Sequence, residues 1–236
     1  MTNQEDFIST VSHELRTPLT SIRGFAQTML TSWDRLDDAA KKKFLTIIEQ
    51  QSNRLINLVE NILSVTKLPN ESLILKNINV NSSILPVIQI VNEQYKNHII
   101  ETQFDKSNPT ISVDLDKFQQ IMINLIENAA KYSDDGTTIT IITLHTDKYV
   151  IIKVQDEGIG ISDEFKEKIF EKFSRIDNPL TRKIQGSGLG LYITKTLVEK
   201  MNGEISFHNI EKGVEFEVKF PVYSIEEHVK CSVTQL

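Results

Sequence analysis

The stretch FISTVSHELRTPLTSIRGFAQTM, residues 7–29, decides the fold of the first part of the chain. Its apolar residues recur at steps of three and four, which is the spacing of one face of an α-helix. They are Phe7, Val11, Leu15, Pro18, Ile22, Phe25 and Met29. The pattern predicts a helix over residues 6–31, with a bend near Thr17 because Pro18 has no amide hydrogen to donate.

A second helix is predicted from about Asp38 to Thr66, after a short connection over residues 31–37. Its apolar residues follow a near-heptad spacing. Two long helices joined by a short turn form an antiparallel hairpin with one apolar seam, which a lone hairpin cannot enclose. Pairing with a second copy would complete a four-helix bundle, so we expect a homodimer through the helical hairpin.

The helical pattern breaks at Lys67–Glu71, where Pro69 and Asn70 indicate a linker. We therefore expect a helical domain over residues 1–66, a linker over 67–72, a second domain over 73–222 and a polar tail over 223–236. The second domain has strand patterns near 73–78, 99–104, 110–113, 138–144, 149–155, 204–208 and 214–220, and helical patterns near 81–97, 115–132 and 188–201. This order predicts an α+β fold, with the hairpin followed by a two-layer sandwich of one sheet and its covering helices.

Composition excludes several classes of protein. The chain has 236 residues, with 26 Lys plus Arg against 32 Asp plus Glu, so the net charge of −6 argues against a nucleic-acid partner. Cys231 is the one cysteine and forms no intramolecular disulfide; a spare thiol in a reducing compartment is the simplest interpretation. No apolar run reaches the length of a membrane span, and the first residues lack the features of a secretory signal. We expect no membrane contact by this chain itself.

His13 falls almost opposite the apolar stripe of the first helix, on a face shared with Thr10, Thr17, Thr20 and Gly24. These small neighbours leave room for a large group to approach the imidazole. A histidine at such a position is often only a solvated surface residue. Its neighbours, however, favour a catalytic role for His13. Glu14 could fix the tautomer and accept a proton, and Thr17 could hold a water or a phosphoryl oxygen.

Glycines cluster at Asp156–Gly160, with the sequence DEGIG, and at Gly186–Gly190, with the sequence GSGLG. Glycines let backbone N–H groups approach phosphates, and the second cluster opens onto a predicted helix whose N-terminus favours anions. Neither cluster is a Walker A or a Rossmann motif. Either cluster alone could serve only to form a turn.

The long helix of the second domain carries Asn124 and Asn128 one turn apart, followed by Lys131 and Tyr132. Asn oxygens can bind Mg²⁺, Lys131 can meet phosphate charge, and Tyr132 can pack on or hydrogen bond the nucleoside. In isolation this is only a polar stripe on an amphipathic helix. With both glycine clusters following in order, it favours a nucleotide site.

Residues 7–20 resemble the phosphoacceptor segment of sensor histidine kinases from two-component systems. Residues 121–133, 156–160, 169–175 and 186–191 resemble the N, G1, F and G2 boxes of the ATP-binding domain of that family. The five motifs stand in family order across residues 6–222. The resemblance implies an ATP:protein-histidine phosphotransferase that phosphorylates itself on His13, passes the phosphoryl group to an Asp of a response regulator receiver domain, and also acts as a regulator phosphatase.

The resemblance also implies a role for each matching residue. His13 would accept the phosphoryl group, Glu14 would assist proton transfer, and Thr17 would position water. Asp156 would hydrogen bond the adenine amino group. Asn128 would be the Mg²⁺ ligand, with Asn124 nearby, and residues 174–187 would form a mobile lid over ATP. The remaining residues expected at the nucleotide are Lys131, Tyr132, Gly158, Gly160, Arg175, Arg182, Gly186, Gly188, Leu189 and Gly190.

Two other functions stay open. ATPases of the same superfamily hydrolyse ATP with a Glu one turn before the Mg²⁺-binding Asn; here that position is Asn124, which cannot act as a base, and Glu127 points to another side of the helix. A degenerate kinase serving only as a dimerisation scaffold is the other alternative. We expect a cytoplasmic location, either as a soluble protein or as the soluble part of a membrane-anchored sensor.

Overall fold

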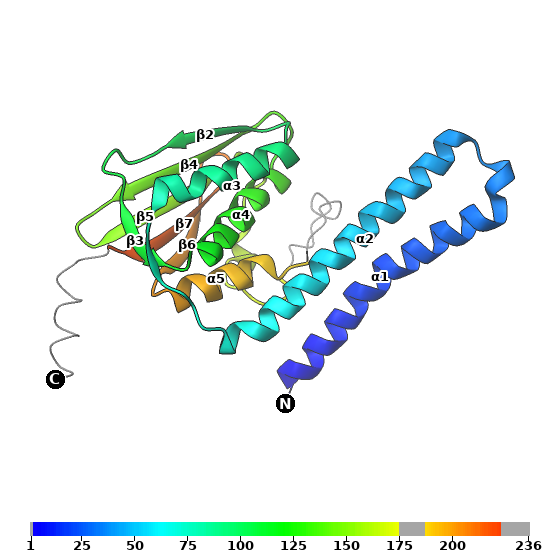
Figure 1. Ribbon diagram of the computed structural model, residues 1–236, viewed down its shortest axis with the longest axis horizontal. Helices are drawn as coiled ribbons and strands as arrows, with labels where there is room; N and C mark the ends of the chain where they lie inside the picture. The colour runs from blue at the N-terminus through cyan, green and yellow to red at the C-terminus, as the bar shows by residue number, and fades with distance from the viewer. Residues whose placement is uncertain (1, 175–186, 223–236) are drawn as a thin grey trace. The chain divides into compact units, whose positions relative to one another are not determined.

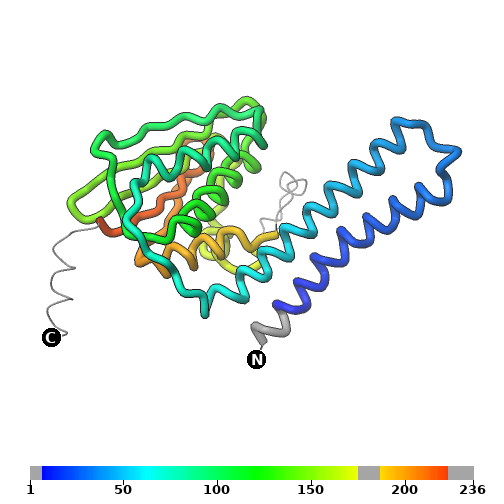
Figure 2. The backbone as a smooth tube through the Cα atoms, viewed as in Figure 1, coloured from blue at the N-terminus to red at the C-terminus, as the bar shows by residue number. Residues whose placement is uncertain are grey.

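The computed structural model describes residues 2–174 and 187–222, with side chains from Phe7 on. The chain divides into two compact units. Of the described residues, the first unit contains 2–69, 171–174 and 187–190, and the second contains 70–170 and 191–222. Figure 2 traces the backbone through both.

Two long antiparallel helices make up the helical hairpin of the first unit, α1 (Thr2–Ser32) and α2 (Asp38–Lys67) (Figure 1). A 3₁₀ turn over Trp33–Arg35 joins them, and the Asp37 side chain caps α2 by accepting a hydrogen bond from the Ala40 amide at 2.7 Å. Both predicted helices are confirmed. α1 continues through the buried Pro18, and the bend near Thr17 stays a prediction.

The seam between α1 and α2 is apolar. Phe25 and Phe44 pack with ring centroids 5.2 Å apart, and Met29, Leu58 and Val65 are buried. Other large apolar side chains of the same helices are exposed to solvent, among them Ile8, Leu19, Leu30, Leu45, Ile56, Val59 and Leu63. The hairpin therefore leaves part of its apolar surface uncovered.

The second unit is built on a five-stranded sheet in the order β2-β4-β5-β7-β6. Its strands are β2 (Ile99–Gln103), β4 (Thr138–His145), β5 (Tyr149–Gln155), β6 (Glu204–Asn209) and β7 (Val214–Pro221); β2 runs parallel to β4 and the other pairs are antiparallel. A separate two-stranded antiparallel sheet joins β1 (Lys76–Asn79) to β3 (Thr110–Val113).

Helices α3 (Val80–Gln94), α4 (Leu115–Lys131) and α5 (Gly190–Lys200) cover one face of the five-stranded sheet (Figure 1). The alternation of the strands explains this, since Ile139, Ile141, Ile152, Val154 and Val218 point to the covered face and are buried. On the other face Lys153 lies 2.7 Å from Glu215 and 3.2 Å from Glu217. The predicted α+β fold, a helical hairpin followed by a two-layer sandwich, is confirmed.

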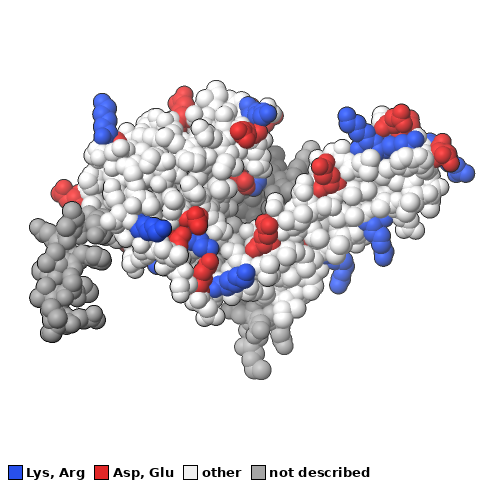
Figure 3. All heavy atoms as spheres, in the orientation of Figure 1, with Lys and Arg blue, Asp and Glu red and all other residues white. Residues whose placement is uncertain are grey.

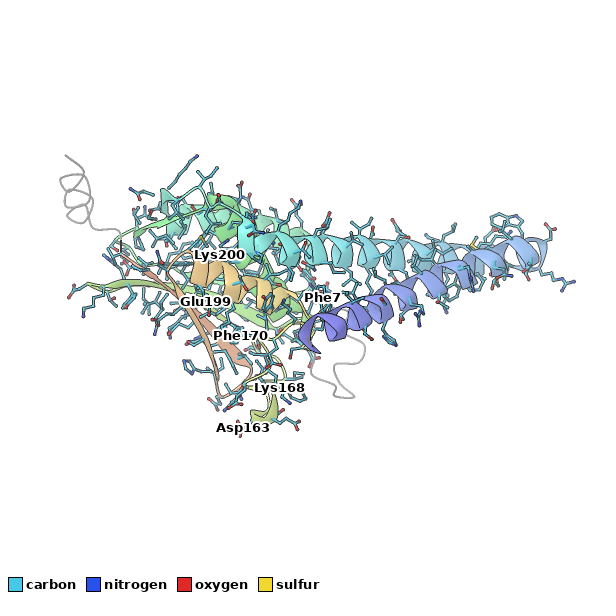
Figure 4. All side chains as sticks on the ribbon, turned by 90° about the horizontal axis from the view of Figure 1, so that it is seen from below. Phe7, Asp163, Lys168, Phe170, Glu199 and Lys200 are labelled. Atoms are coloured by element: carbon cyan, nitrogen blue, oxygen red, sulfur yellow. The ribbon has the colours of Figure 1, made fainter. Side chains whose placement is uncertain are left out.

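Glu71 lies inside the stretch where we expected a linker. Its carboxylate pairs with Lys117 at 2.7 Å, and its carbonyl accepts a hydrogen bond from Lys200 at 2.8 Å (Lys200 is labelled in Figure 4). The backbone of the second unit is thus held in place from Glu71 on.

Charges are mixed on the surface. On the face shown in Figure 3, Lys and Arg side chains alternate with Asp and Glu and do not gather into one basic field. In the part of the chain that the structure describes, no helix is both long and apolar enough to cross a membrane.

Candidate active site

His13 lies on α1 with its side chain 76% exposed, as the helical arc of the apolar stripe predicts. Its Nδ1 lies 3.9 Å from Oε1 of Glu14, so the nitrogen nearer the backbone faces a carboxylate. One turn further along, the Thr17 hydroxyl donates to the His13 carbonyl at 3.3 Å. The imidazole is therefore open to an incoming group, with a proton acceptor beside it.

Glu14 is itself held from the second helix. Arg54 on α2 donates from Nη2 to Oε2 of Glu14 at 3.3 Å, and both side chains are about one fifth exposed. Oε1 is the oxygen that lies 3.9 Å from the imidazole of His13. Sequence reasoning missed Arg54, because nothing in its local pattern distinguishes it from any other polar residue on a helix.

Asn124 and Asn128 lie on α4, on the face that the helical spacing predicts. The Asn124 amide donates to the hydroxyl of the buried Thr194 on α5 at 2.6 Å, and its carbonyl oxygen has no hydrogen bond from the residues that the structure describes. Asn128 makes no side-chain hydrogen bond to the residues that the structure describes. Two neutral oxygen donors one turn apart suit Mg²⁺, which prefers oxygen ligands and keeps much of its shell for water and phosphate. Among the described residues no cluster of three His, Cys, Asp or Glu offers another metal site.

Lys131 and Tyr132 end the same helix. The Lys131 ammonium pairs with Glu127 at 2.5 Å. Burial alone would lower the pKa of Lys131, but Glu127 and Tyr95 outweigh it and the pKa is raised, so the side chain stays cationic. Glu127 therefore faces Lys131, and that it does not serve as a base stays a prediction.

Asp156 follows β5 and is only 6% exposed. One carboxylate oxygen, Oδ1, accepts from the amides of Gly158 at 2.9 Å and Val214 at 3.1 Å. Burial raises the pKa of this carboxyl, although the two amide hydrogen bonds act in the opposite direction. The other oxygen has no hydrogen bond from the described residues and can accept one from a ligand.

The G1 loop, residues 156–160, is packed tightly on the end of α4. A Cβ on Gly158 would lie 2.3 Å from the Tyr132 carbonyl oxygen, and the Ile159 amide donates to that same oxygen at 3.3 Å. Gly160 has a φ of +74°, in the region that favours glycine. The loop can take this path only because both positions lack a side chain.

Two residues that the sequence did not single out shape the same loop. Gly213, with a φ of +94°, has its α-carbon so close to Asp156 that a Cβ would lie 2.0 Å from the Asp156 carbonyl oxygen. Asn209 bridges to the Ile161 backbone, accepting from its amide at 2.9 Å and donating to its carbonyl at 2.7 Å. Gly213 stands in the turn before β7. A glycine at such a turn is the one feature of the sequence that could have indicated this residue.

The second glycine cluster is described only in part. Gly188 has a φ of +67°, and a Cβ there would lie 2.8 Å from the backbone of Phe173. Leu189 is fully buried, and α5 begins at Gly190, two residues after the start near Gly188 that the sequence predicts. Arg175, Arg182, Gly186 and most of the expected lid over 174–187 lie outside the described residues.

The F box contributes Phe170, which is labelled in Figure 4. Its ring meets Phe207 of β6 edge-on with centroids 6.2 Å apart, and the Lys195 ammonium lies 5.6 Å from the ring centroid. Phe170 is thus a packing residue beside β6.

Comparison with known proteins identifies both parts of the chain. Residues 3–71 match the family described as "His Kinase A (phospho-acceptor) domain". Residues 113–224 match the family described as "Histidine kinase-, DNA gyrase B-, and HSP90-like ATPase". The two matches include His13, the helix with both asparagines and both glycine clusters.

Whole proteins of the same kind are also similar. The signal transduction histidine-protein kinase ArlS of Staphylococcus haemolyticus is 33% identical over 205 residues, which are 86% of this chain and 45% of ArlS. The sensor histidine kinase WalK of Bacillus subtilis is 32% identical over 238 residues, 95% of this chain and 38% of WalK. The chain thus spans less than half the length of these two relatives.

Among solved structures, histidine kinase ThkA in complex with the response regulator protein TrrA has a TM-score of 0.77 at 30% identity, over 92% of this chain and 61% of that one. Histidine kinase AdeS of Acinetobacter baumannii shares the fold, with a TM-score of 0.70 over 90% of this chain and 98% of that chain at 24% identity. With an exposed histidine on a hairpin of the phosphoacceptor family and an ATPase-type sandwich after it, the chain belongs to the sensor histidine kinases and comprises their catalytic portion.

Proposed function

We propose that this chain phosphorylates itself on His13 with ATP and then passes the phosphoryl group to an aspartate of a response regulator. The observation that carries the proposal is the exposed His13 imidazole with the Glu14 carboxylate 3.9 Å from its Nδ1. An accessible nucleophile with a proton acceptor on its other nitrogen is what transfer to a histidine requires.

The step follows from the two nitrogens. The neutral imidazole keeps its proton on Nδ1, beside Glu14, and its lone pair on Nε2. Nε2 forms a bond to the γ-phosphorus while the bond from that phosphorus to the bridging oxygen breaks, and ADP leaves with the electron pair. The Nδ1 proton then passes to Glu14, which leaves a neutral imidazole ring in the phosphohistidine. In-line positioning and charge neutralisation supply most of the catalysis in such a transfer.

Nucleotide binding is assigned to the catalytic domain expected over residues 73–222. Oδ2 of Asp156 would accept a hydrogen bond from the adenine amino group, and Tyr132 would contact the nucleoside. Gly158, Gly160, Gly188 and the start of α5 at Gly190 would bring backbone amides to the phosphates. The proposal also includes the nucleotide contacts expected of Arg175, Arg182, Gly186 and Leu189.

Asn128, with Asn124 beside it, would hold Mg²⁺. The ion, when bound, supplies charge neutralisation at the phosphates. The Asn124 carbonyl is oriented for this by the hydrogen bond between its amide and Thr194. Lys131 would add a second positive charge at the same end of the nucleotide.

The chain would work as a homodimer. The exposed apolar side chains of α1 and α2 are those that a four-helix bundle would bury, and the match to the phosphoacceptor family supports this pairing. The catalytic domain, residues 73–222, would move about the linker over 67–72 to reach His13. Because Glu71 is tied to Lys117 and Lys200, most of that movement is assigned to residues before Glu71.

The regulator would dock on the helical face around Thr17 and Thr20. ThkA, which is similar over most of this chain, was solved in complex with a response regulator protein, and this supports a partner of that class. Thr17 would position the water that removes the phosphoryl group from the regulator. We assign the core to the cytoplasm, where its phosphoryl donor ATP is found.

Labelling tests the proposal directly. The chain is incubated with γ-labelled ATP and Mg²⁺, and we expect an acid-labile, alkali-stable label on the wild type and none on His13→Gln. Both proteins should bind ATP equally well, because the substitution lies in the hairpin. A label that survives in His13→Gln, or wild-type protein that binds ATP and stays unlabelled, would contradict the proposal.

A further inference from the structure

The two ends of the Asn124 side chain lie in different surroundings. Its amide nitrogen, Nδ2, donates to the hydroxyl oxygen of Thr194 at 2.6 Å, and Thr194 is only 1% exposed. Its carbonyl oxygen accepts no hydrogen bond from the residues that the structure describes. Among those residues, the one buried side-chain polar atom without a partner is the Ser133 hydroxyl, so the Asn124 oxygen is not buried. The donor end is thus held inside the fold, while the acceptor end is open to solvent.

Thr194 connects two helices of the second unit. It lies one turn after Gly190, where α5 begins, and its partner Asn124 lies on α4. The other threonine of α5 behaves differently, since the Thr196 hydroxyl donates to the Tyr192 carbonyl of its own helix at 2.9 Å. The Thr194 hydroxyl therefore joins the helix that follows the second glycine cluster to a residue expected at the metal.

An asparagine that binds a cation has to direct its oxygen at the ion, because its NH₂ group is a donor only. A free asparagine side chain rotates about two bonds and can present either end. The bond to Thr194 keeps the NH₂ group in the interior, so the oxygen is the end that faces outward. Less rotational freedom is then lost when that oxygen binds a ligand. Mg²⁺ demands near-ideal octahedral geometry, so the direction of each oxygen ligand matters.

We propose that Thr194 is a positioning residue, which holds the Asn124 carbonyl oxygen ready for Mg²⁺ and so determines part of the gain in ATP affinity that Mg²⁺ brings. Residues that orient a metal ligand in this way affect metal binding without touching the metal. The inference rests on the proposed role of Asn124 at the metal.

ATP binding by the full chain tests it, measured by calorimetry once with excess Mg²⁺ and once with EDTA. Thr194→Val nearly keeps the shape of the side chain and removes the hydroxyl. We expect ATP to bind about three- to tenfold more weakly with Mg²⁺ and as tightly as wild type in EDTA, because one hydrogen bond is lost that acts only through the metal ligand. Thr194→Ser keeps the hydroxyl and should restore most of the affinity with Mg²⁺.

Thr196→Val is the matched control. It removes a hydroxyl from the same helix that bonds only within that helix, and it should leave both affinities unchanged. Thr194→Ala is measured beside Thr194→Val, with the unfolding temperature of each in EDTA, and should show the same loss confined to Mg²⁺. An equal loss with Mg²⁺ and in EDTA, or no loss in either condition, would overturn the inference.

A double variant separates positioning from packing. In an Asn124→Ala background, Thr194→Val should have no further effect on ATP binding with Mg²⁺, because the group through which it acts is gone. A further loss there as large as in the wild-type background would also overturn the inference. If Asn124→Ala itself leaves the gain from Mg²⁺ unchanged, the assignment of Asn124 fails and Thr194 with it, while labelling of His13 still tests the kinase independently.

Discussion

Arg54 and Glu14 join the two helices of the hairpin at the phosphoacceptor. The Arg54 guanidinium lies 3.3 Å from Oε2 of Glu14, and Oε1 of the same carboxylate lies 3.9 Å from His13 Nδ1. The carboxylate beside the histidine is thus oriented from the other helix. The packing of α1 on α2 therefore helps to position the carboxylate that we expect to accept the imidazole proton.

Replacing Arg54 should slow phosphoryl transfer without weakening nucleotide binding. Arg54→Met keeps most of the aliphatic stem and removes the guanidinium, so Glu14 loses the group that orients it. We expect the rate constant of autophosphorylation to fall about three- to tenfold, the effect of one hydrogen bond to a charged group that acts indirectly. The measurement is single-turnover labelling at saturating ATP. Asn53→Ala, at the exposed neighbouring position, should retain the wild-type rate; equal rates for Arg54→Met and wild type would remove Arg54 from the site.

ATP affinity should depend on the ionisation of Asp156. Its pKa is raised by burial, so as the pH falls the carboxylate takes up a proton earlier than an ordinary aspartate, whose pKa is about 3.9. The protonated group cannot accept from the adenine amino group as well as it did. We therefore expect the dissociation constant for ATP to rise as the pH falls. The rise should begin at a pH above the ordinary aspartate pKa. Calorimetry across pH on wild-type protein measures this.

Asp156→Asn is the matched variant. Its amide oxygen can still accept from Gly158 and Val214, but its NH₂ group would face the adenine amino group, donor against donor. We expect ATP to bind about tenfold to a hundredfold more weakly at neutral pH, with the dependence on acidic pH lost and the unfolding temperature little changed. Wild-type affinity in this variant would show that Asp156 does not face the base.

Gly158→Ala should destabilise the second unit. Its Cβ would lie 2.3 Å from the Tyr132 carbonyl oxygen, which is backbone at the end of α4 and cannot swing aside. We expect a cost of about 1–3 kcal/mol in unfolding free energy, together with weaker ATP binding. Gly24→Ala adds the same methyl group on α1, where nothing lies within 4 Å, and should stabilise its helix by about 0.5–1 kcal/mol. Calorimetric unfolding compares the two; a neutral Gly158→Ala would contradict the close packing.

Asp114 should stabilise α4 in a pH-dependent way. It caps the helix, with one oxygen accepting from Lys117 at 3.2 Å and the other from Ile74 at 2.9 Å. Burial would raise its pKa, but these amide hydrogen bonds and the Lys117 charge outweigh burial and the pKa is lowered. A lowered folded pKa means that the charge contributes fully above the ordinary aspartate range, and that the contribution is lost as the pH falls through the folded pKa.

The comparison of Asp114→Ala with Asp114→Asn separates the cap from the charge. Asp114→Ala should cost about 1 kcal/mol at neutral pH, and Asp114→Asn less, because asparagine caps helices well. Both differences from wild type should shrink in acid, below about pH 4. Urea unfolding at neutral and acidic pH measures them, and differences that do not vary with pH would exclude a role for the charge.

Much of this molecule was predictable because its signals are local. The steps of three and four over residues 7–29 place His13 opposite the seam, and the structure shows that side chain exposed. Alternation predicted the strands of the main sheet, and the change of period at Pro69 lies at the boundary between the two compact units. Helix spacing also placed Asn124 and Asn128 on one face of α4, whereas the role of Asp156 came from the family resemblance, and the roles of Asn128 and Asp156 at the nucleotide stay predictions.

Tertiary structure alone decided which side chains hold these residues. Arg54 with Glu14, Thr194 with Asn124 and the Val214 amide with Asp156 are pairs separated by tens of residues, and no local pattern links them. Local differences had the same origin: the predicted helix over 81–97 ends at Gln94, where the backbone turns at Tyr95 to enter β2. Periodicity tells which face of an element is buried, but which residue meets which across that face depends on how the elements pack.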